Sequence, residues 1–256
     1  MGIKDSDIVI EMSGIYKSFG SQKVHEGINL LIPRNKISVI LGPSGTGKSV
    51  LLKQMMGLIM PDKGNIFVDG ENLVEMDKKQ LLKVRKKFGM LFQSAALFDS
   101  MSVYENVAFP LREHTKFKED EIKNIVMEKL RLVGLVNVEN KMPSELSGGM
   151  RKRVGLARAI ALEPQIILYD EPTTGLDPIM RDMVDNLIYE TQKELDVTSV
   201  VISHDIDSTN KIGDYVSMIY NGKTIINDTI DNFRKTDDPY VKQFLSGSME
   251  GPIKVN

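Results

Sequence analysis

The sequence contains no cysteine. This absence excludes disulfide scaffolds, thiol catalysis, and zinc or iron–sulfur sites that depend on cysteine ligands. Long hydrophobic runs are also missing, because no stretch approaches the roughly 18 apolar residues that a membrane-spanning helix needs. Residues 1–7 lack the apolar core of a secretion signal. We therefore expect a soluble intracellular chain.

An excess of charge of one sign is lacking as well. The 33 Lys and Arg residues nearly balance the 35 Asp and Glu residues, which leaves a formal net charge of −2. Charge alone therefore gives no reason to expect a nucleic-acid partner, and we predict none. What the chain does have is 256 residues, of which 41% are hydrophobic and 27% are charged. This composition is typical of a globular protein with a substantial core.

Short apolar runs alternate with longer segments of helical periodicity along the chain. Residues 37–41, 166–169 and 197–202 have the pattern of buried strands, and residues 151–162 and 178–195 have the pattern of helices. This alternation predicts an α/β fold in which helices cover a mostly parallel sheet.

Two regions depart from this alternation. Shorter, turn-rich apolar segments at residues 8–32 and 64–69 predict an antiparallel β portion beside the parallel sheet. Residues 94–162 have a largely helical pattern, which is clearest at residues 118–134. We therefore expect a separate helical region in the middle of the chain.

A complete phosphate-binding motif, G-x-x-x-x-G-K-[ST], stands between a predicted strand and a predicted helix. It consists of Gly42, Pro43, Ser44, Gly45, Thr46, Gly47, Lys48 and Ser49. Glycines leave room for backbone N–H groups around phosphate oxygens, and the following helix N-terminus adds partial positive charge. We expect Lys48 to reach the β- and γ-phosphates and the Ser49 hydroxyl to bind Mg²⁺. A chance match in a chain of this length has odds on the order of one in a hundred.

Polar residues follow three other predicted strands at their carboxyl ends, where parallel sheets bind ligands. Asp170 suits Mg²⁺ binding and Glu171 suits a general base, with an acidic helix cap as the alternative for this pair. His204 has a corresponding place, although a histidine there is more often structural. Gln93 could orient water or metal, but this signal is weak by itself.

Two further features leave alternatives open. Ser147, Gly148 and Gly149 precede a basic helical run, which suits either a second anion site at a helix N-terminus or an ordinary N-cap. Residues 78–87 contain six basic residues. A solvated helix face is the favoured interpretation of this run, and contact with anionic lipid headgroups is the alternative.

In order and across nearly the full chain, these motifs resemble those of the ATP-binding-cassette (ABC) ATPase family. The set comprises residues 42–49, Gln93, residues 146–149, Asp170-Glu171, residues 175–177 and His204. The resemblance implies a P-loop NTPase of ABC type, with a mostly parallel core sheet, an antiparallel β subdomain and a helical signature subdomain. The implied ATPase domain covers residues 1–235, with the helical subdomain inserted at about residues 94–162, and residues 236–256 form a C-terminal extension.

The resemblance also implies a homodimer with ATP and Mg²⁺ as cofactors, in which two nucleotides lie between the chains. Glu171 would be the catalytic base, His204 would contact the γ-phosphate, and Gln93 would link Mg²⁺ or water to the transport partner. Ser49, Gln93 and Asp170 would be the residues at the metal.

The remaining implied site residues contact the nucleotide or the second chain. Phe19 would stack on adenine, and Tyr16 is the less favoured candidate. Ser147, Gly148 and Gly149 would face the nucleotide bound by the partner, and Asp177 would communicate across the dimer. Met150 replaces the glutamine that most members carry. The resemblance implies that this difference alters the tuning of ATP hydrolysis and does not abolish it.

A narrower resemblance is to the ATPase subunits of Mce-type lipid transporters of the Mla kind. It is carried by residues 90–98, 110–115, 147–153 and 238–245. It implies phospholipid transport across the bacterial envelope, at the cytoplasmic face of the inner membrane. The implied partners are integral membrane permease subunits, an Mce-domain lipid-binding protein and a STAS-domain protein. It also suggests that the C-terminal tail packs on the neighbouring ATPase.

Other classes of function remain as alternatives. A transporter of another cargo, such as an amino acid, a metal or a lipoprotein, shares the general motifs. An ABC ATPase acting on ribosomes or DNA usually has two cassettes or a coiled coil, and this chain has one phosphate loop. A scaffold that binds ATP without turnover is disfavoured, because Lys48, Asp170, Glu171 and His204 are all present.

Overall fold

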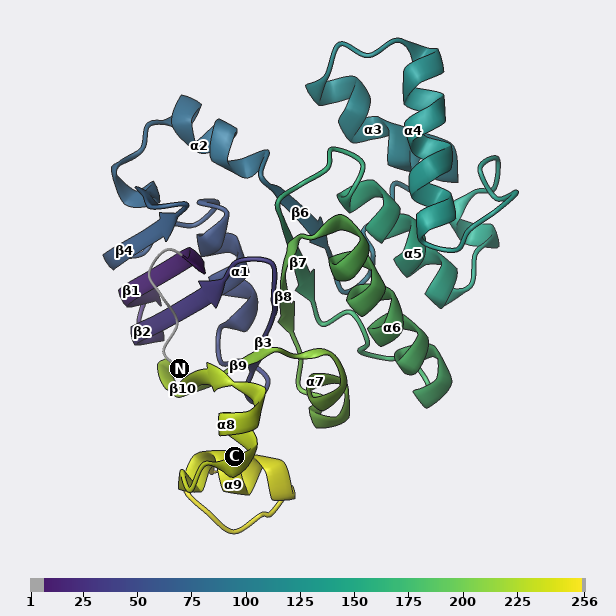
Figure 1. Cartoon of the computed structure of the whole chain (residues 1–256). Helices are drawn as coiled ribbons and strands as arrows, with labels where there is room; N and C mark the ends of the chain where they lie inside the picture. Colours follow the sequence, from purple (N-terminus) through teal and green to yellow (C-terminus); the bar gives the residue numbers. More distant parts are fainter. Residues whose placement is uncertain (1–6, 255–256) are drawn as a thin grey trace. The chain divides into compact units, whose positions relative to one another are not determined.

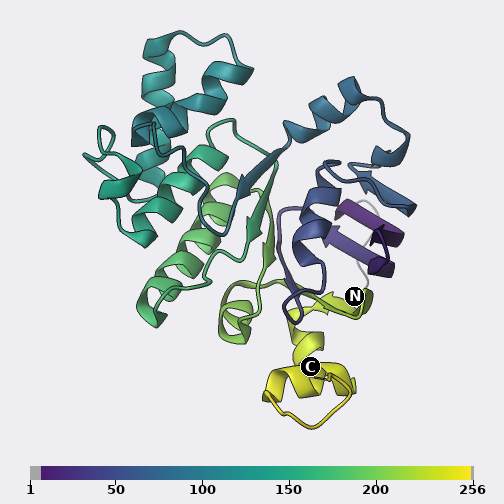
Figure 2. The same cartoon turned by 180° about the vertical axis from the view of Figure 1, so that it is seen from behind.

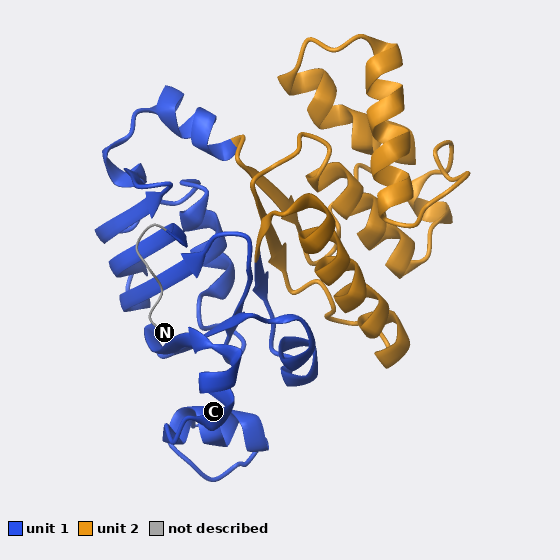
Figure 3. Ribbon diagram, viewed as in Figure 1, with its two compact units in different colours: residues 1–85, 200–256 blue, residues 86–199 orange. Residues whose placement is uncertain are grey.

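The structure is a computed structural model that describes residues 7–254 (Figures 1 and 2). The chain divides into two compact units (Figure 3). The first unit contains Met1–Arg85 and Val200–Asn256, and the second contains Lys86–Ser199. Each unit is described below by itself.

The first unit contains most of the strands. Its strands are β1 (Ile8–Phe19), β2 (Gln22–Pro33), β3 (Ile37–Leu41), β4 (Lys63–Val68), β5 (Glu71–Asn72), β9 (Tyr215–Tyr220) and β10 (Lys223–Thr229). Its helices are α1 (Lys48–Met55), η2 (Leu73–Glu75, a 3-10 turn), α2 (Lys78–Arg85), α7 (Ile206–Ile212), α8 (Ile230–Lys235) and α9 (Pro239–Ser246).

Strands β1, β2, β4 and β5 form an antiparallel sheet in the order β2-β1-β4-β5. Its side chains alternate imperfectly between buried and exposed, because register shifts interrupt the β1–β2 pairing. The buried residues Ile10, Met12 and Ile28 belong to one hydrophobic core. The predicted antiparallel β portion is therefore confirmed.

The phosphate motif belongs to a different group of strands in the first unit, ordered β10-β9-β3-β8. Strand β8 (Thr198–Ile202) belongs to this unit from Val200 onward. The residue that follows it, Ser203, donates its backbone N–H to the Ile40 carbonyl over 3.2 Å. Strands β3 and β9 are parallel, and all five residues of β3 are buried. Burial on both faces explains why the sequence of β3 is continuously apolar and does not alternate.

The second unit is mostly helical. Strands β6 (Phe88–Leu91) and β7 (Ile166–Asp170) pair in parallel. The helices are α3 (Val103–His114), α4 (Glu119–Leu132), η3 (Pro143–Glu145, a 3-10 turn), α5 (Gly148–Ala159) and α6 (Pro178–Leu195). Helices α3, α4 and α5 pack against one another. This arrangement confirms the helical region predicted in the middle of the chain.

Capping residues set the helix starts in the second unit. Ser102 begins α3 with a capping box that it shares with Glu105. Helix α6 begins at Pro178, as predicted, because the Asp177 carboxylate accepts the N–H groups of the next turn. Helix α5 was predicted to begin at residue 151, and this was wrong. It begins at Gly148, because Ser147 caps it. Gly148 and Gly149, the two glycines of the signature segment (residues 146–149), therefore lie in its first turn.

The C-terminal segment folds onto its own helix α9. The Gln243 side chain, which is 7% exposed, donates to the Ile253 carbonyl over 2.9 Å and accepts the Ile253 N–H over 2.6 Å. A side chain at Gly251 would collide with Gln243, since a Cβ atom there would lie 2.3 Å from Oε1. The Lys254 N–H donates to the Tyr220 hydroxyl over 3.1 Å. Docking of the tail on a neighbouring ATPase remains a prediction.

No helix within residues 7–254 is long and apolar enough to cross a membrane.

Candidate nucleotide-binding site

The phosphate loop connects β3 to α1 in the first unit, and its backbone requires glycine at defined positions. Gly42, Gly45 and Gly47 have φ values of 154°, 79° and 86°, a region that other L residues rarely adopt. A Cβ atom at Gly42 would lie 2.3 Å from the Ile219 carbonyl oxygen. At Gly47 it would lie 2.4 Å from Val24. Gly42 and Gly47 are therefore favoured by both backbone conformation and space, and Gly45 by backbone conformation alone.

Lys48 stands at the first position of α1 and is 5% exposed. Its ammonium group donates to the carbonyl oxygens of Gly42 and Pro43, each over 2.8 Å. The Thr46 hydroxyl donates to the same Pro43 carbonyl over 2.9 Å. These bonds direct loop carbonyls toward Lys48, which helps to leave the loop N–H groups for an anion.

His25 packs against the phosphate loop, and sequence reasoning missed it. It is 1% exposed on β2, and its Nε2–H donates to the Gly47 carbonyl over 3.2 Å. Burial lowers the pKa of His25 below its usual value, and the bond to Gly47 partly opposes this. Nothing local in the sequence places this histidine near residue 47, because the contact joins two separate strand–loop segments.

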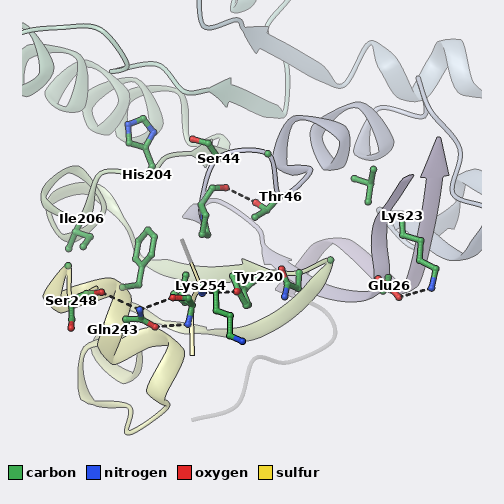
Figure 4. Close-up of a pocket in the computed structure, with 18 of the residues that line it drawn as sticks. Lys23, Glu26, Ser44, Thr46, His204, Ile206, Tyr220, Gln243, Ser248 and Lys254 are labelled. Atoms are coloured by element: carbon green, nitrogen blue, oxygen red, sulfur yellow. Dashed lines mark hydrogen bonds and ion pairs between the residues drawn. The ribbon is translucent and has the colours of Figure 1, made fainter. Parts of the chain in front are cut away.

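A cavity of about 1160 Å³ in the first unit is lined by both the phosphate loop and His204. Residues 43–46 contribute on one side, together with Gln22 and Lys23 of β2. Figure 4 shows Ser44, Thr46 and His204 around this space, with Gln243 and Lys254 of the C-terminal segment also lining it. Small-molecule sites typically have volumes of about 300–1,000 Å³, so this cavity has room for a nucleotide.

His204 follows β8 and is exposed. It therefore lies where the sequence predicts, beside the phosphate loop residues that line the same cavity. The next residue, Asp205, caps α7 by accepting the Ser208 N–H over 2.9 Å. This cap holds the backbone at His204 and leaves its ring at the surface.

Phe19 ends β1 and is 47% exposed, with the Lys17 ammonium 5.5 Å from its ring centroid. It does not line the cavity. Tyr16 is 46% exposed, and its ring lies against Gly27. The open face of Phe19 is compatible with a stacked base, and its contact with adenine remains a prediction.

In the second unit, Asp170 ends β7 and Glu171 follows it with φ of 47°, in the left-handed region. The Thr174 hydroxyl donates to Glu171 Oε2 over 2.9 Å and orients the carboxylate. This pair does not begin a helix, because α6 starts at Pro178 with Asp177 as its cap. The alternative of an acidic helix cap at residues 170–171 is therefore wrong.

Lys152 of α5 reaches the segment that carries Glu171. It is 7% exposed, and its ammonium donates to the carbonyl of Pro172. Burial lowers the pKa of Lys152, and the charge of Glu171 opposes this. The sequence indicated only a basic run here, so this link between α5 and the segment that carries Glu171 was not anticipated.

The signature segment begins α5. The Ser147 hydroxyl accepts the Met150 N–H over 3.3 Å, so an ordinary N-cap is present. No atom lies within 4 Å of a Cβ built at Gly148, whereas at Gly149 that atom would lie 1.9 Å from Met180. A side chain at Gly149 would therefore have to displace the terminal methyl group of Met180 in α6, while Gly148 leaves an open approach to the helix N-terminus. The cap does not exclude the anion site, because other N–H groups of the first turn remain.

Gln93 is exposed just beyond β6. The turn that follows it has positive φ at Ala95 and Ala96, whose carbonyls accept bonds from Arg158 over 2.7 and 2.8 Å. Arg158 belongs to α5 and was missed by sequence reasoning. One helix therefore holds the Gln93 turn, the Glu171 segment and the signature residues of the second unit.

The residues predicted at the metal offer oxygen ligands, which are what Mg²⁺ prefers. Within residues 7–254, no group of three or more His, Asp or Glu side chains is arranged to hold a metal by itself. In nucleotide sites Mg²⁺ is bound through one or two side chains together with phosphate oxygens and water. Ser49, Gln93 and Asp170 each carry such a side-chain oxygen, and their joint binding of the ion remains a prediction.

A glycine-lined phosphate loop between a buried parallel strand and a helix defines a P-loop nucleoside triphosphatase. A family model described as "ABC transporter" matches residues 25–174. The chain belongs to the ATP-binding cassette family of ABC transporters, which confirms the resemblance and the fold class inferred from the motifs.

Two sets of relatives match almost the whole chain. The probable ribonucleotide transport ATP-binding protein mkl of Mycobacterium tuberculosis is 48% identical over 246 residues, covering 96% of this chain and 68% of that protein. The intermembrane phospholipid transport system ATP-binding protein MlaF of Escherichia coli is 44% identical over 245 residues, covering 96% of this chain and 91% of that protein.

Solved structures agree on the fold. The cbiO1 protein of Clostridium perfringens, part of the ABC transporter complex cbiONQ, matches with a TM-score of 0.83 and 31% identity, over 93% of this chain and 95% of that chain. A dimeric ATP-binding cassette in a post-hydrolysis state, bound to ADP and Pi, matches with a TM-score of 0.78 and 29% identity. The match covers 86% of this chain and 98% of that chain. The chain is therefore an ATP-binding and hydrolysing cassette that drives a transporter, and cassettes of this kind dimerise and work with membrane permeases.

Proposed function

We propose that this protein is the ATPase subunit of a phospholipid transporter of the Mce type in the bacterial envelope. The observation that carries this proposal is the near end-to-end match to MlaF, at 44% identity over 96% of this chain and 91% of the relative. The proposed partners are a second copy of the chain, integral membrane permease subunits, an Mce-domain lipid-binding protein and a STAS-domain protein. The proposed location is the cytoplasmic face of the inner membrane, where binding is peripheral through the permease.

A second cargo has its own support. The mkl relatives, named for ribonucleotide transport, are 48% identical over 96% of this chain. They match over only 68% of their own length, whereas MlaF matches over 91%. We therefore favour phospholipid and treat ribonucleotide as the second candidate.

The proposed chemistry is attack of water on the γ-phosphate of ATP. Water oxygen forms a bond to phosphorus, the bond to the β-phosphate oxygen breaks, and the proton of the water passes to the Glu171 carboxylate. The Thr174 hydroxyl orients that carboxylate, and His204 contacts the γ-phosphate. Mg²⁺ would be held by Ser49, Gln93 and Asp170, and it would supply positive charge that stabilises the negative charge of the phosphates.

Binding of the nucleotide is divided between the two chains in this proposal. The phosphate loop, Lys48 and Ser49 hold the phosphates, and Phe19 stacks on adenine. Ser147, Gly148 and Gly149 of the partner subunit complete the site, and support for this comes from the open space around Gly148. Asp177 stands at the dimer contact in the same proposal, and Gln93 links the metal to the permease.

We also propose a domain organisation on this basis. Residues 1–235 form the ATPase domain with a helical subdomain at about residues 94–162, and residues 236–256 form an extension. The support is that α9 and the turn around Gln243 follow the last strand as a separate segment.

Co-purification of the tagged chain from detergent-solubilised membranes tests the cargo. We expect an integral membrane permease and an Mce-domain protein to be recovered, with phospholipid detected in the complex by mass spectrometry. Recovery of a periplasmic binding protein for ribonucleotides or amino acids in place of the Mce-domain protein would overturn the phospholipid assignment.

A further inference from the structure

Helix α2 (Lys78–Arg85) presents two different faces. Leu81 and Val84 are 7% and 3% exposed and pack into the first unit. Lys78, Lys79 and Lys83 are exposed, and Leu82 between them is 57% exposed. The spacing of Lys79, Leu82 and Lys83 is i, i+3, i+4, so these side chains form one stripe on the helix. In Figure 1 this helix lies at the end of the first unit opposite α9.

This exposed face is held rigidly by the rest of the unit. The Arg85 guanidinium donates to the carbonyls of Met56 and Gly57 at the end of α1, over 3.3 and 2.7 Å. Gly57 lies directly against Leu81, since a Cβ atom there would be 2.9 Å from the leucine Cδ2. The helix that carries the basic stripe is therefore anchored to the first unit by its buried face and by Arg85.

The three lysines of the stripe have no ion-pair or hydrogen-bond partner within residues 7–254. The neighbouring acidic groups have other roles. Asp77 accepts the Gln80 N–H over 2.8 Å at the helix start, and Glu75 accepts a bond from Asn72 over 2.8 Å. By contrast, Lys17 forms an ion pair with Asp62 over 2.7 Å. The charge of the α2 stripe is thus left uncompensated by bonds to its neighbours.

Exposed aliphatic side chains accompany this charge. Val74 of η2 is 41% exposed and Leu58, which follows the Gly57 contact, is 53% exposed. Lysine is a flexible point charge, so it suits a diffuse anionic surface better than the planar bidentate recognition for which arginine is adapted. Lysine stems and aliphatic side chains also suit the boundary between headgroups and acyl chains.

We propose that the α2 stripe, Lys78, Lys79, Leu82 and Lys83, contacts anionic lipid headgroups of the membrane in which the permease lies. The proposal rests on the membrane-transport role of the family and not on the identity of the cargo. Each lysine near an anionic bilayer gains about 1 kcal/mol, which corresponds to about a five-fold increase in partitioning. Three lysines therefore give roughly a hundred-fold preference for anionic over neutral vesicles, and tethering by the permease adds to this.

Co-sedimentation of the full chain with vesicles tests the proposal. The vesicles contain either phosphatidylcholine alone or phosphatidylcholine mixed with phosphatidylglycerol. We expect binding only to the anionic vesicles, weakened by salt, and reduced roughly a hundred-fold in the triple variant Lys78→Gln, Lys79→Gln, Lys83→Gln. A matched control, Lys116→Gln, Lys123→Gln, Lys141→Gln, removes the same charge from exposed lysines elsewhere and retains binding.

Several results would overturn the assignment. One is equal loss of binding in both triple variants, which would make net charge the cause. Another is unchanged vesicle binding in the α2 variant. A third is loss of permease co-purification by the α2 variant when the wild-type chain does not bind vesicles, which would indicate an acidic protein partner. Basal ATP hydrolysis is measured for every variant and is expected to stay at the wild-type rate, because α2 is outside the proposed catalytic residues.

Discussion

At the scale of single residues, the phosphate loop depends on side chains outside its own motif. His25 contacts the Gly47 carbonyl, and Val24 lies where a side chain at Gly47 would have to go. The loop is therefore supported by β2 as well as by its own glycines. A change in the charge of His25 acts directly on this support.

Acidification is expected to destabilise the protein through His25. Its pKa is lowered in the folded state from a usual value of 6.5, so the unfolded chain takes up the proton first as pH falls. Stability is therefore complete above the usual pKa and is lost below it, by at most about 1.4 kcal/mol per pH unit. Urea unfolding at about pH 7.5 and about pH 5.5 should show a smaller loss for His25→Asn than for wild type.

The exposed His114 provides the control for this measurement. His114→Asn should retain the full pH dependence of the wild-type chain. An identical pH dependence in His25→Asn and wild type would contradict the prediction, because the titrating group would then lie elsewhere.

Residues within one short motif could be predicted from the sequence, and residues that meet from distant segments could not. Lys48 belongs to the phosphate-binding motif, and Glu171 and His204 follow apolar runs that predict strands, so local patterns were sufficient to single them out. His25, Lys152 and Arg158 act through contacts with backbone carbonyls of other segments. Such contacts depend on tertiary packing and have no signature in local spacing.

At the scale of elements, helix α5 organises the second unit. It carries Ser147 at its cap, Lys152 against the Glu171 segment and Arg158 on the Gln93 turn. The strands and α6 were predicted closely because apolar runs and a proline after Asp177 mark them. The start of α5 was predicted three residues late, because glycines at its first turn weaken the helical pattern while the serine cap supplies the missing bond.

The turn after α9 is held largely by one side chain, Gln243, which makes three hydrogen bonds to it. Gln243→Leu removes its bonds to Ile253 and Ser248, each worth about 0.5–1.5 kcal/mol. We expect backbone amide exchange at Ile253 to rise about ten-fold or more, with little change in overall stability. Hydrogen-exchange mass spectrometry of residues 247–254 measures this.

Lys242 is the matched control for this element, because it is exposed and pairs with Asp237 at the surface. Lys242→Gln should leave exchange at residues 247–254 unchanged. Wild-type exchange in the Gln243→Leu variant would show that the turn is held by other contacts.

At the scale of the whole molecule, the family assignment makes the dimer the working form. The match to a dimeric cassette bound to ADP and Pi supports a site completed by a second chain. Within one chain, Ser147 lies at the start of α5 in one unit, and the phosphate loop belongs to the other unit. Binding and hydrolysis of ATP should therefore be linked to association of two chains.

Glu171→Gln should uncouple these steps. Glutamine keeps the size of the side chain but does not take up the proton of the attacking water, so turnover should fall by at least about 10²-fold while ATP still binds. ATP-bound dimers should then accumulate, and light scattering after size exclusion measures them.

Glu163 offers a close control for this variant. It is also a glutamate with positive φ, at 52°, and its exposed carboxylate pairs with the buried Lys129, which also pairs with Glu128. Glu163→Gln should hydrolyse ATP normally. Normal hydrolysis by Glu171→Gln as well would remove Glu171 from the role of base.

The backbone at Glu171 has a consequence for protein engineering. Its φ of 47° disfavours most residues with a Cβ atom, by roughly 1–2 kcal/mol relative to an ordinary conformation. Glycine escapes this penalty. Directed evolution that rewards heat resistance alone should therefore favour Glu171→Gly, which removes the proposed catalytic base. Each selection round must then also demand ATP turnover.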